Sequence, residues 1–217
     1  MIAIIDYGMG NLRNVERAFR RLGIPAVVTG DRREVEKASA LVLPGVGAFT
    51  AAMENLRRAG LEVVIREAVE GGRPFLGICL GLQLLFEESE EGAEGGARPR
   101  GLGLLPGRVV RFKEGLKVPQ IGWNQLHILR PEAPELQGIE EGSFFYFVHS
   151  YYALPADPGT VAATTDYGVS FASAVWRDNL FAVQFHPEKS SRAGLTLLAN
   201  FARRAGLRVQ EEGEACR

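Results

Sequence analysis

The strongest constraint in this sequence is the regular alternation of short apolar runs with helix-period segments through its first half. The apolar runs have strand length and lie at 2–6, 26–29, 40–43 and 74–79. Between them, apolar residues recur at helical spacing at 12–22, at 49–69 with an interruption near Gly60, and at 80–88, and Asp31 is placed to cap a further short helix. Such alternation is typical of βα units around a mostly parallel sheet.

The second half has a different pattern, with several strand-like runs and no long helix between them. These runs lie at 108–112, 120–129, 143–152, 161–165, 171–177 and 180–185. Consecutive strands without crossover helices favour antiparallel hairpins, here added to the sheet. A last helix is expected at 192–205, and a polar tail at 208–217 is expected to fray. We therefore expect one α/β domain, 1–207, built as a three-layer sandwich: a mixed, mostly parallel central sheet with helices on both faces.

Composition excludes several classes of protein. A chain of 217 residues with 46% hydrophobic and 24% charged residues is long and apolar enough for a globular core. The net charge of −1 gives no basic footprint for nucleic acid, and no uninterrupted apolar run reaches the ~18 residues of a membrane span. Two cysteines, Cys79 and Cys216, cannot build a disulfide framework, and the first residues show no basic leader. We expect a cytoplasmic protein without metal or cofactor.

The segment with the clearest chemical signal surrounds Cys79. Gly77 and Gly81 flank the thiol by two residues on either side, at the point where an apolar strand ends and a helix begins. This pattern permits the cramped turn of a nucleophile elbow, which pushes the sulfur out of the fold beside the N–H groups of the helix start. The same turn would aim the Leu80 N–H at the oxygen of a tetrahedral intermediate. The alternative is a small, buried and inert cysteine.

A thiol nucleophile requires a base and usually a group that orients the base. His186 follows an apolar strand and is joined through Pro187 to Glu188. Because proline fixes its own φ and favours an extended residue before it, the histidine and the glutamate can project to similar sides. Glu188 could then hold one imidazole nitrogen while the other meets the sulfur. The alternative is a strand-ending histidine with a solvated glutamate.

A second oxyanion donor should come from another loop. Pro44-Gly45-Val46-Gly47 ends the third predicted strand, and its two glycines let a peptide N–H turn towards a ligand at little steric cost. An ordinary strand-to-helix turn is the alternative.

In combination, these residues resemble the class I, triad-type glutamine amidotransferases. The resemblance narrows to the glutaminase subunits of imidazole glycerol phosphate synthases, and it covers residues 2–205. It is carried by the stretches Asp6-Tyr-Gly-Met-Gly-Asn11, Leu43-Pro-Gly-Val-Gly47, Gly77-Ile-Cys-Leu-Gly-Leu-Gln83, Gln120-Ile-Gly-Trp-Asn124, Phe145-Tyr-Phe-Val-His-Ser-Tyr-Tyr152 and His186-Pro-Glu188.

The resemblance implies a reaction and a role for each motif. Cys79 would attack the side-chain amide of glutamine, His186 would act as general base and acid, and Glu188 would orient it. The N–H groups of Leu80 and of the Val46-Gly47 peptide would form the oxyanion hole.

The resemblance also implies how glutamine is held. Gln83 would lie against the substrate and Glu91 would pair with its ammonium, while backbone groups of Ser150 and Tyr151 would meet its carboxylate. Glu91 lies in a run of acids, where a solvated face is the alternative, and Ser150 and Tyr151 could simply be strand residues. His149 is expected to be a structural histidine.

The family passes ammonia to a partner, which by similarity is a cyclase with a (β/α)8 barrel in a heterodimer. Asn11, Trp123, Tyr146 and Lys189 would face this partner. Trp123 could instead belong to the core, and Asn11 could only cap a helix.

Three other functions remain open from the sequence alone. The chain could be a glutaminase for another acceptor, as in anthranilate or aminodeoxychorismate synthases. It could be a stand-alone cysteine hydrolase or peptidase that uses the same elbow. It could also be a flavodoxin-like binding module in which Cys79 is buried and inert.

Overall fold

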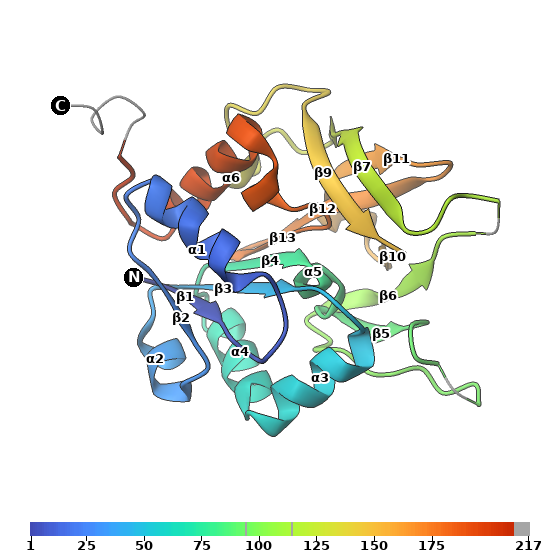
Figure 1. The fold of residues 1–217 in the computed structure, drawn as a ribbon, viewed down its shortest axis with the longest axis horizontal. Coiled ribbons are helices and arrows are strands. Elements are labelled where there is room, and N and C mark those ends of the chain that lie inside the picture. Colours follow the sequence, from blue (N-terminus) through green and yellow to red (C-terminus); the bar gives the residue numbers. More distant parts are fainter. Residues whose placement is uncertain (94, 114, 211–217) are drawn as a thin grey trace.

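The computed structural model describes residues 1–93, 95–113 and 115–210, which form a large twisted sheet, a small second sheet and covering helices (Figure 1). The main sheet has the strand order β2-β1-β3-β4-β13-β12-β10-β6-β5, and β11 and β8 extend it beside β12. Its strands are β1 (Ile2–Ile5), β2 (Ala26–Thr29), β3 (Ala40–Gly45), β4 (Phe75–Cys79), β5 (Phe86–Ser89), β6 (Leu105–Arg111), β8 (His127–Ile128), β10 (Tyr151–Pro155), β11 (Val161–Asp166), β12 (Ser170–Arg177) and β13 (Leu180–Val183). The helices are α1 (Leu12–Arg21), α2 (Arg32–Lys37), α3 (Phe49–Arg58), α4 (Leu61–Glu70), α5 (Leu80–Gln83) and α6 (Ser191–Arg204), with the 3-10 turns η1 (Pro134–Leu136), η2 (Pro158–Thr160) and η3 (Pro187–Lys189).

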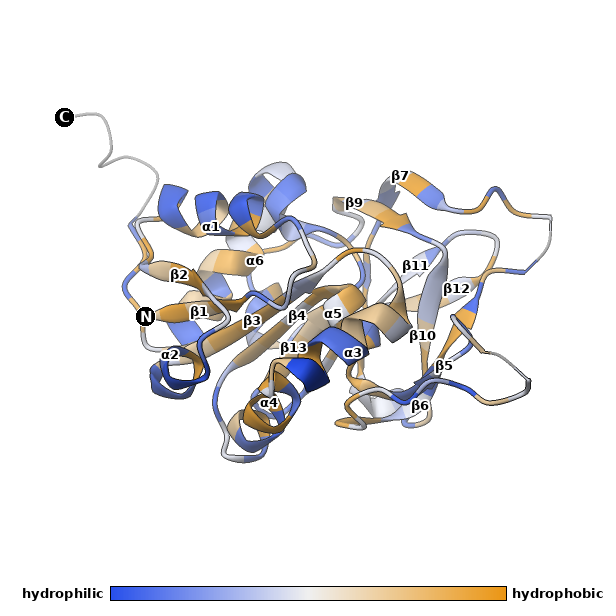
Figure 2. Ribbon diagram, turned by 60° about the horizontal axis from the view of Figure 1, so that its bottom comes forward, coloured by the Kyte–Doolittle hydropathy of each residue, from blue (hydrophilic) through white to orange (hydrophobic). Residues whose placement is uncertain are grey.

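Three layers arise because the buried strands present apolar residues to both faces. On β1, Ile2 and Ile4 join the core beneath α1 and α6, whereas Ala3 and Ile5 join the core beneath α2, α3 and α4. The helices turn their polar sides outward, and the central strands are apolar throughout (Figure 2). Strands buried on both faces read as continuous apolar runs, as they do here. The predicted three-layer α/β fold is therefore confirmed.

The two predicted helix caps have different outcomes. Asp31 accepts hydrogen bonds from the N–H groups of Arg33 and Glu34, so it caps α2 as expected. Asn11 does occupy the N-cap position of α1, but its side chain makes no capping hydrogen bond.

The second half adds antiparallel strands, with one difference from the prediction. β12 and β13 form an antiparallel hairpin, and β10 pairs antiparallel with both β12 and β6. However, β7 (Gln120–Gln125) and β9 (Phe144–His149) pair only with each other as a separate two-stranded sheet. This small sheet is attached by the packing of Phe145 and Phe147 against Phe185 and by a hydrogen bond from the His186 N–H to the Tyr146 carbonyl.

The predicted helix at 80–88 is wrong beyond its first turn. α5 ends at Gln83, and β5 follows and pairs parallel with β6. Leu84 and Leu85 are fully buried, and their carbonyl oxygens accept from the N–H groups of Leu102 and Leu105 instead of continuing a helix. A stretch buried on all sides has no polar face, so its periodicity could not separate helix from strand.

The predicted tail lies only partly within the described residues. Arg208, Val209 and Gln210 follow α6 and run beside α1, where the Gln210 N–H donates to the Leu22 carbonyl at 3.1 Å. The remaining part of that expectation, residues 211–217, lies outside the described residues. Among the described helices, none combines the length and hydropathy needed to cross a membrane.

The corner between β4 and α5 is packed against β3. A Cβ added to Gly81 would overlap the carbonyl of Leu43, and one added to Gly77 would lie 2.9 Å from the Gly81 oxygen. These neighbours are main-chain atoms of β3 and α5, which cannot move aside as a flexible side chain can. Glycine is therefore required on both sides of Cys79 by close packing.

We expect Gly81→Ala to lower the free energy of unfolding by about 3 kcal/mol, because the added methyl group must displace a central strand. Gly72→Ala is the matched control: Gly72 has φ +81° but open space around its Cβ position. It should cost only the left-handed strain, about 1 kcal/mol. Urea titrations followed by circular dichroism measure both, and equal losses would contradict the packing argument.

Candidate active site

Cys79 lies at the junction of β4 and α5 in a conformation that L-residues rarely adopt. Its φ is +54° and its ψ −109°. Such strain costs about 1–3 kcal/mol and persists only where the surrounding structure enforces it. The thiol is 5% exposed and lines a cavity. The predicted elbow is therefore present in the structure, and Cys79 forms part of the cavity wall.

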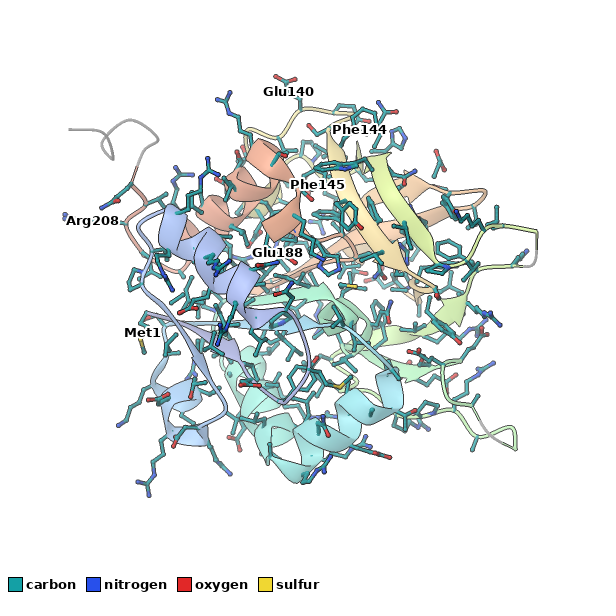
Figure 3. The ribbon with its side chains drawn as sticks, in the orientation of Figure 1. Met1, Glu140, Phe144, Phe145, Glu188 and Arg208 are labelled. Carbon is teal, nitrogen blue, oxygen red and sulfur yellow. The ribbon has the colours of Figure 1, made fainter. Side chains whose placement is uncertain are left out.

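His186 reaches the same place from the neighbouring strand. β13 pairs parallel with β4, with Val183 opposite Ile78, so both chains leave the sheet at the same edge. His186 Nδ1 and Glu188 Oε1 are 2.8 Å apart, and both side chains are almost completely buried. Glu188 lies on η3, and Figure 3 shows it in the region between α1 and β9. The structure thus brings Cys79, His186 and Glu188 together.

The electrostatics of this group favour a charged imidazole. Burial lowers the pKa of His186, but hydrogen bonds and charges from Cys79 and Glu188 outweigh burial and raise it to about 10. His186 Nε2 is buried and has no nitrogen or oxygen partner among the described residues. A ring that carries both protons can return one to a leaving group.

Ser190 holds the main chain of His186 in place. This role of Ser190 was not predicted from the sequence. Its hydroxyl donates to the His186 carbonyl at 2.6 Å and accepts from the Tyr146 N–H at 3.0 Å. The His186 N–H in turn donates to the Tyr146 carbonyl at 2.9 Å. The histidine backbone is therefore fastened to β9 on both sides. A serine two residues after a His-Pro-Glu sequence gives no signal of this role.

The cavity at Cys79 has a volume of about 270 Å³, near the lower end for small-ligand sites. Its walls contain every residue predicted for the oxyanion hole and for substrate, together with three that the sequence did not indicate. The lining residues are Val46, Gly47, Cys79, Leu80, Gln83, Glu91, Pro119, Val148, His149, Ser150 and Tyr151. These residues come from widely separated segments of the chain, so the fold, and not proximity in sequence, brings them to one cavity.

Glu91 is not on a solvated face, which was the alternative for its acidic run. Its Oε2 accepts from the Phe49 N–H at 2.9 Å, at the start of α3. The N-cap residue of that helix, Ala48, has no side chain that could do this. Burial raises the pKa of Glu91, although the hydrogen bond from Phe49 opposes the change. The carboxylate is thus held at the cavity wall by a helix N-terminus.

His149 is buried among the rings of Phe112, Phe147 and Phe171. Burial lowers its pKa to about 4, so the ring is neutral at neutral pH. Nδ1 lies 2.8 Å from the Tyr151 carbonyl, to which it donates. This hydrogen bond and the packing agree with a structural histidine, although its edge also lines the cavity.

Three of the four predicted interface residues form a continuous surface: Trp123 and Tyr146 lie on the small sheet, and Lys189 lies beside them on η3. Trp123 is 47% exposed and packs edge-on against Tyr146, and the Lys189 ammonium lies 5.6 Å from the centre of the Tyr146 ring. Two exposed apolar side chains on the same strands, Ile121 and Phe144, were not predicted. Trp123 is therefore not a core residue.

The fourth predicted interface residue, Asn11, is exposed at the start of α1. The preceding Gly10 lies against Pro44 and Gly45, because a Cβ added there would be 3.6 Å from atoms of both. Asn11 thus follows a loop that covers the predicted oxyanion strand.

Comparison with known families gives the chain its classification. The family model described as "Glutamine amidotransferase class-I" matches residues 3–205. The chain belongs to the class I glutamine amidotransferases. Within this family it is 56% identical over 208 residues to imidazole glycerol phosphate synthase subunit HisH of Syntrophotalea carbinolica, covering 93% of this chain and 98% of the relative. It is 54% identical to the subunit of that name from Aquifex aeolicus, covering 93% and 96%.

Solved structures of amidotransferases share the fold. One described as "Crystal structure of glutamine amidotransferase" superposes with a TM-score of 0.73 at 24% identity, covering 95% of this chain and 99% of the other. The structure of PurLQS from Thermotoga maritima gives 0.71 at 18% identity, covering 94% and 97%. The family model and the two relatives confirm the resemblance recognised in the sequence, and the solved structures confirm the fold.

The raised pKa of His186 gives a pH prediction for this amidotransferase. Because the folded pKa lies above the usual 6.5, the charged ring stabilises the fold fully below that pH, and the contribution is lost as pH rises towards 10. In Glu188→Gln the ring should lose its proton at lower pH, because the neutral amide no longer stabilises the charge. NMR titration of the histidine Cε1 protons measures both proteins. His149 is the internal control, since its ring stays neutral; identical His186 curves in both proteins would contradict the assignment.

Proposed function

We propose that this chain is the glutaminase subunit of imidazole glycerol phosphate synthase. The observation that carries the proposal is that Cys79 lines one cavity with the predicted glutamine-binding residues and also interacts with His186, which is paired with the buried Glu188. The identity of more than half of all residues with two subunits of that name supports the same assignment. The acceptor alternatives, anthranilate or aminodeoxychorismate synthesis, have no comparable support.

The proposed reaction gives each of these groups a chemical role. The Cys79 thiolate attacks the side-chain carbonyl carbon of glutamine. The oxyanion that forms accepts hydrogen bonds from the N–H groups of Leu80 and of the Val46-Gly47 peptide. His186 gives its proton to the departing nitrogen, so that ammonia leaves and a glutamyl thioester remains. Water then attacks the thioester, His186 takes a proton from it, and glutamate and the thiolate are released.

The proposed binding mode uses the remaining walls of the cavity. Glu91 pairs with the substrate ammonium, and the backbone of Ser150 and Tyr151 meets the carboxylate. Gln83 donates from Nε2 to the Tyr151 carbonyl at 2.8 Å, which leaves its Oε1 to face the substrate. Partial burial in the cavity keeps these interactions out of bulk water, where they would be weaker.

The proposed partner is a cyclase with a (β/α)8 barrel, which consumes the ammonia within a cytoplasmic heterodimer. It would convert a phosphoribulosyl-formimino-aminoimidazole carboxamide ribonucleotide into imidazole glycerol phosphate and an aminoimidazole carboxamide ribotide. The exposed apolar face of Ile121, Trp123 and Phe144 supports this docking, since aromatic residues are enriched in the centres of interfaces. Co-purification with a barrel cyclase supports this partner, whereas a chorismate-binding subunit would replace it.

We expect Cys79→Ala to reduce glutamine hydrolysis by more than about 1,000-fold, because the reaction loses its nucleophile. Cys216→Ser is the control and should keep full activity, since residue 216 lies outside the family match at 3–205. Glutamate release is measured with the cyclase and its nucleotide ligand present. Activity retained by the Cys79 variant would refute the mechanism, and hydrolysis of peptides by the isolated wild-type chain would favour a stand-alone hydrolase.

We expect Trp123→Ala to weaken docking of the cyclase by about 2 kcal/mol, or about 30-fold in Kd, because a large aromatic anchor is lost from the interface. Leu154→Ala removes another exposed apolar side chain, on β10 and outside this face, and should bind like the wild type. Isothermal titration calorimetry measures both. Equal affinity of the Trp123 variant and the wild type would show that the partner docks elsewhere.

A further inference from the structure

Gln184 is a fully buried polar side chain with no role in the proposed reaction so far. It follows β13 directly and lies two residues before His186. Its exposed fraction is 0%, and its main-chain N–H donates to the Ser173 carbonyl at 2.9 Å. Its side-chain amide contacts Cys79 and Gln83, so it touches both the nucleophile and a wall of the cavity. Burying an amide is costly unless its hydrogen bonds are satisfied, and here the partners belong to the site.

The orientation of this amide is fixed by a backbone carbonyl. The Tyr151 carbonyl can only accept, so it requires the nitrogen of Gln83, which lies 2.8 Å away. The same nitrogen lies 3.1 Å from the Gln184 amide, which must therefore present its oxygen. The nitrogen of Gln184 is then left on the other side, 3.7 Å from the sulfur of Cys79. The Gln184 amide therefore presents a donor to the sulfur, whereas the Val148 carbonyl, 3.9 Å from the sulfur, is an acceptor for the thiol.

We propose that Gln184 is a positioning residue for the Cys79 thiolate and for Gln83. Its N–H stabilises the charged sulfur relative to the neutral thiol, because a hydrogen bond to the charged form favours that form. Its oxygen uses the second N–H of Gln83, so that Gln83 has only its own oxygen free for a ligand. The inference rests on the proposed glutaminase function and adds a residue to it.

Two substitutions separate these two contacts. Gln184→Met removes the donor and the acceptor at nearly the same volume. Gln184→Glu keeps an acceptor for Gln83 but turns a carboxylate towards the sulfur. The titratable groups that act on Cys79, His186 and Tyr7, are retained in both variants.

The first measurement is the rate of Cys79 alkylation by iodoacetamide against pH, in a full chain that also carries Cys216→Ser. Both variants should show the curve displaced to higher pH, because the thiolate loses its donor. The second is glutamine hydrolysis in the complex with the cyclase and its nucleotide. Here kcat should fall by about tenfold or more in both variants, from the loss of a charge-assisted hydrogen bond, whereas KM should rise in Gln184→Met but stay close to the wild-type value in Gln184→Glu.

Ser173→Ala is the matched control. Ser173 is fully buried in the adjacent strand, and its hydroxyl has no partner among the described residues. This variant should keep the wild-type alkylation curve, kcat and KM. Were the Gln184 variants to lower only the melting temperature, with the alkylation curve and kcat unchanged, Gln184 would be a structural residue and the inference would be wrong.

A further measurement needs no substitution at Gln184. Its side-chain amide ¹⁵N–¹H signals should differ between the wild-type chain and Cys79→Ala, because the acceptor of that N–H is removed; unchanged signals would overturn the inference even if the Gln184 variants did not fold. Wild-type chain that alkylates as expected but does not hydrolyse glutamine in the complex would refute the proposed function instead.

Discussion

The parallel pairing of β13 with β4 is the constraint on which the site depends. β4 ends at Cys79, and β13 enters the sheet beside it about a hundred residues later in the chain, with Val183 opposite Ile78. Parallel strands end at the same edge of a sheet, so the thiol and the histidine leave the core together. A shift in this register would turn the alternating side chains to the opposite faces and separate the two groups. The local strain at Cys79 is tolerated because the central sheet on either side of it cannot adjust.

The sequence predicted those parts of the site that are encoded by near neighbours. The glycines around Cys79 predict the elbow, because the space that a Cβ would need is occupied by main-chain atoms of Leu43 and Gly81. Likewise, the proline between His186 and Glu188 keeps their side chains within hydrogen-bond distance of each other. Their union with Cys79 was inferred from the need of a thiol nucleophile for a base and from the resemblance to a family. No local pattern encodes it, because it depends on a strand pairing across the whole domain.

Other features could not be predicted, for identifiable physical reasons. The short α5 was predicted as a longer helix because Leu84 and Leu85 are apolar in either state, and only the carbonyl partners at Leu102 and Leu105 decide between them. The side chains of Gln184 and Ser190 make individual hydrogen bonds to residues far away in the sequence, and such contacts leave no periodic pattern. For Glu91, the acidic run concealed that one carboxylate binds the start of α3.

The attachment of His186 to β9 has an evolutionary consequence. The His186 N–H donates to the carbonyl of residue 146, and the N–H of residue 146 donates to Ser190, whose hydroxyl holds the His186 carbonyl. On residue 146 these bonds use only main-chain N–H and carbonyl groups, which every amino acid except proline supplies in full. The aromatic ring of that residue meanwhile lies on the outer surface beside Trp123 and Lys189. The side chain of residue 146 can therefore change as a partner protein diverges, while the main-chain hydrogen bonds that position His186 are kept.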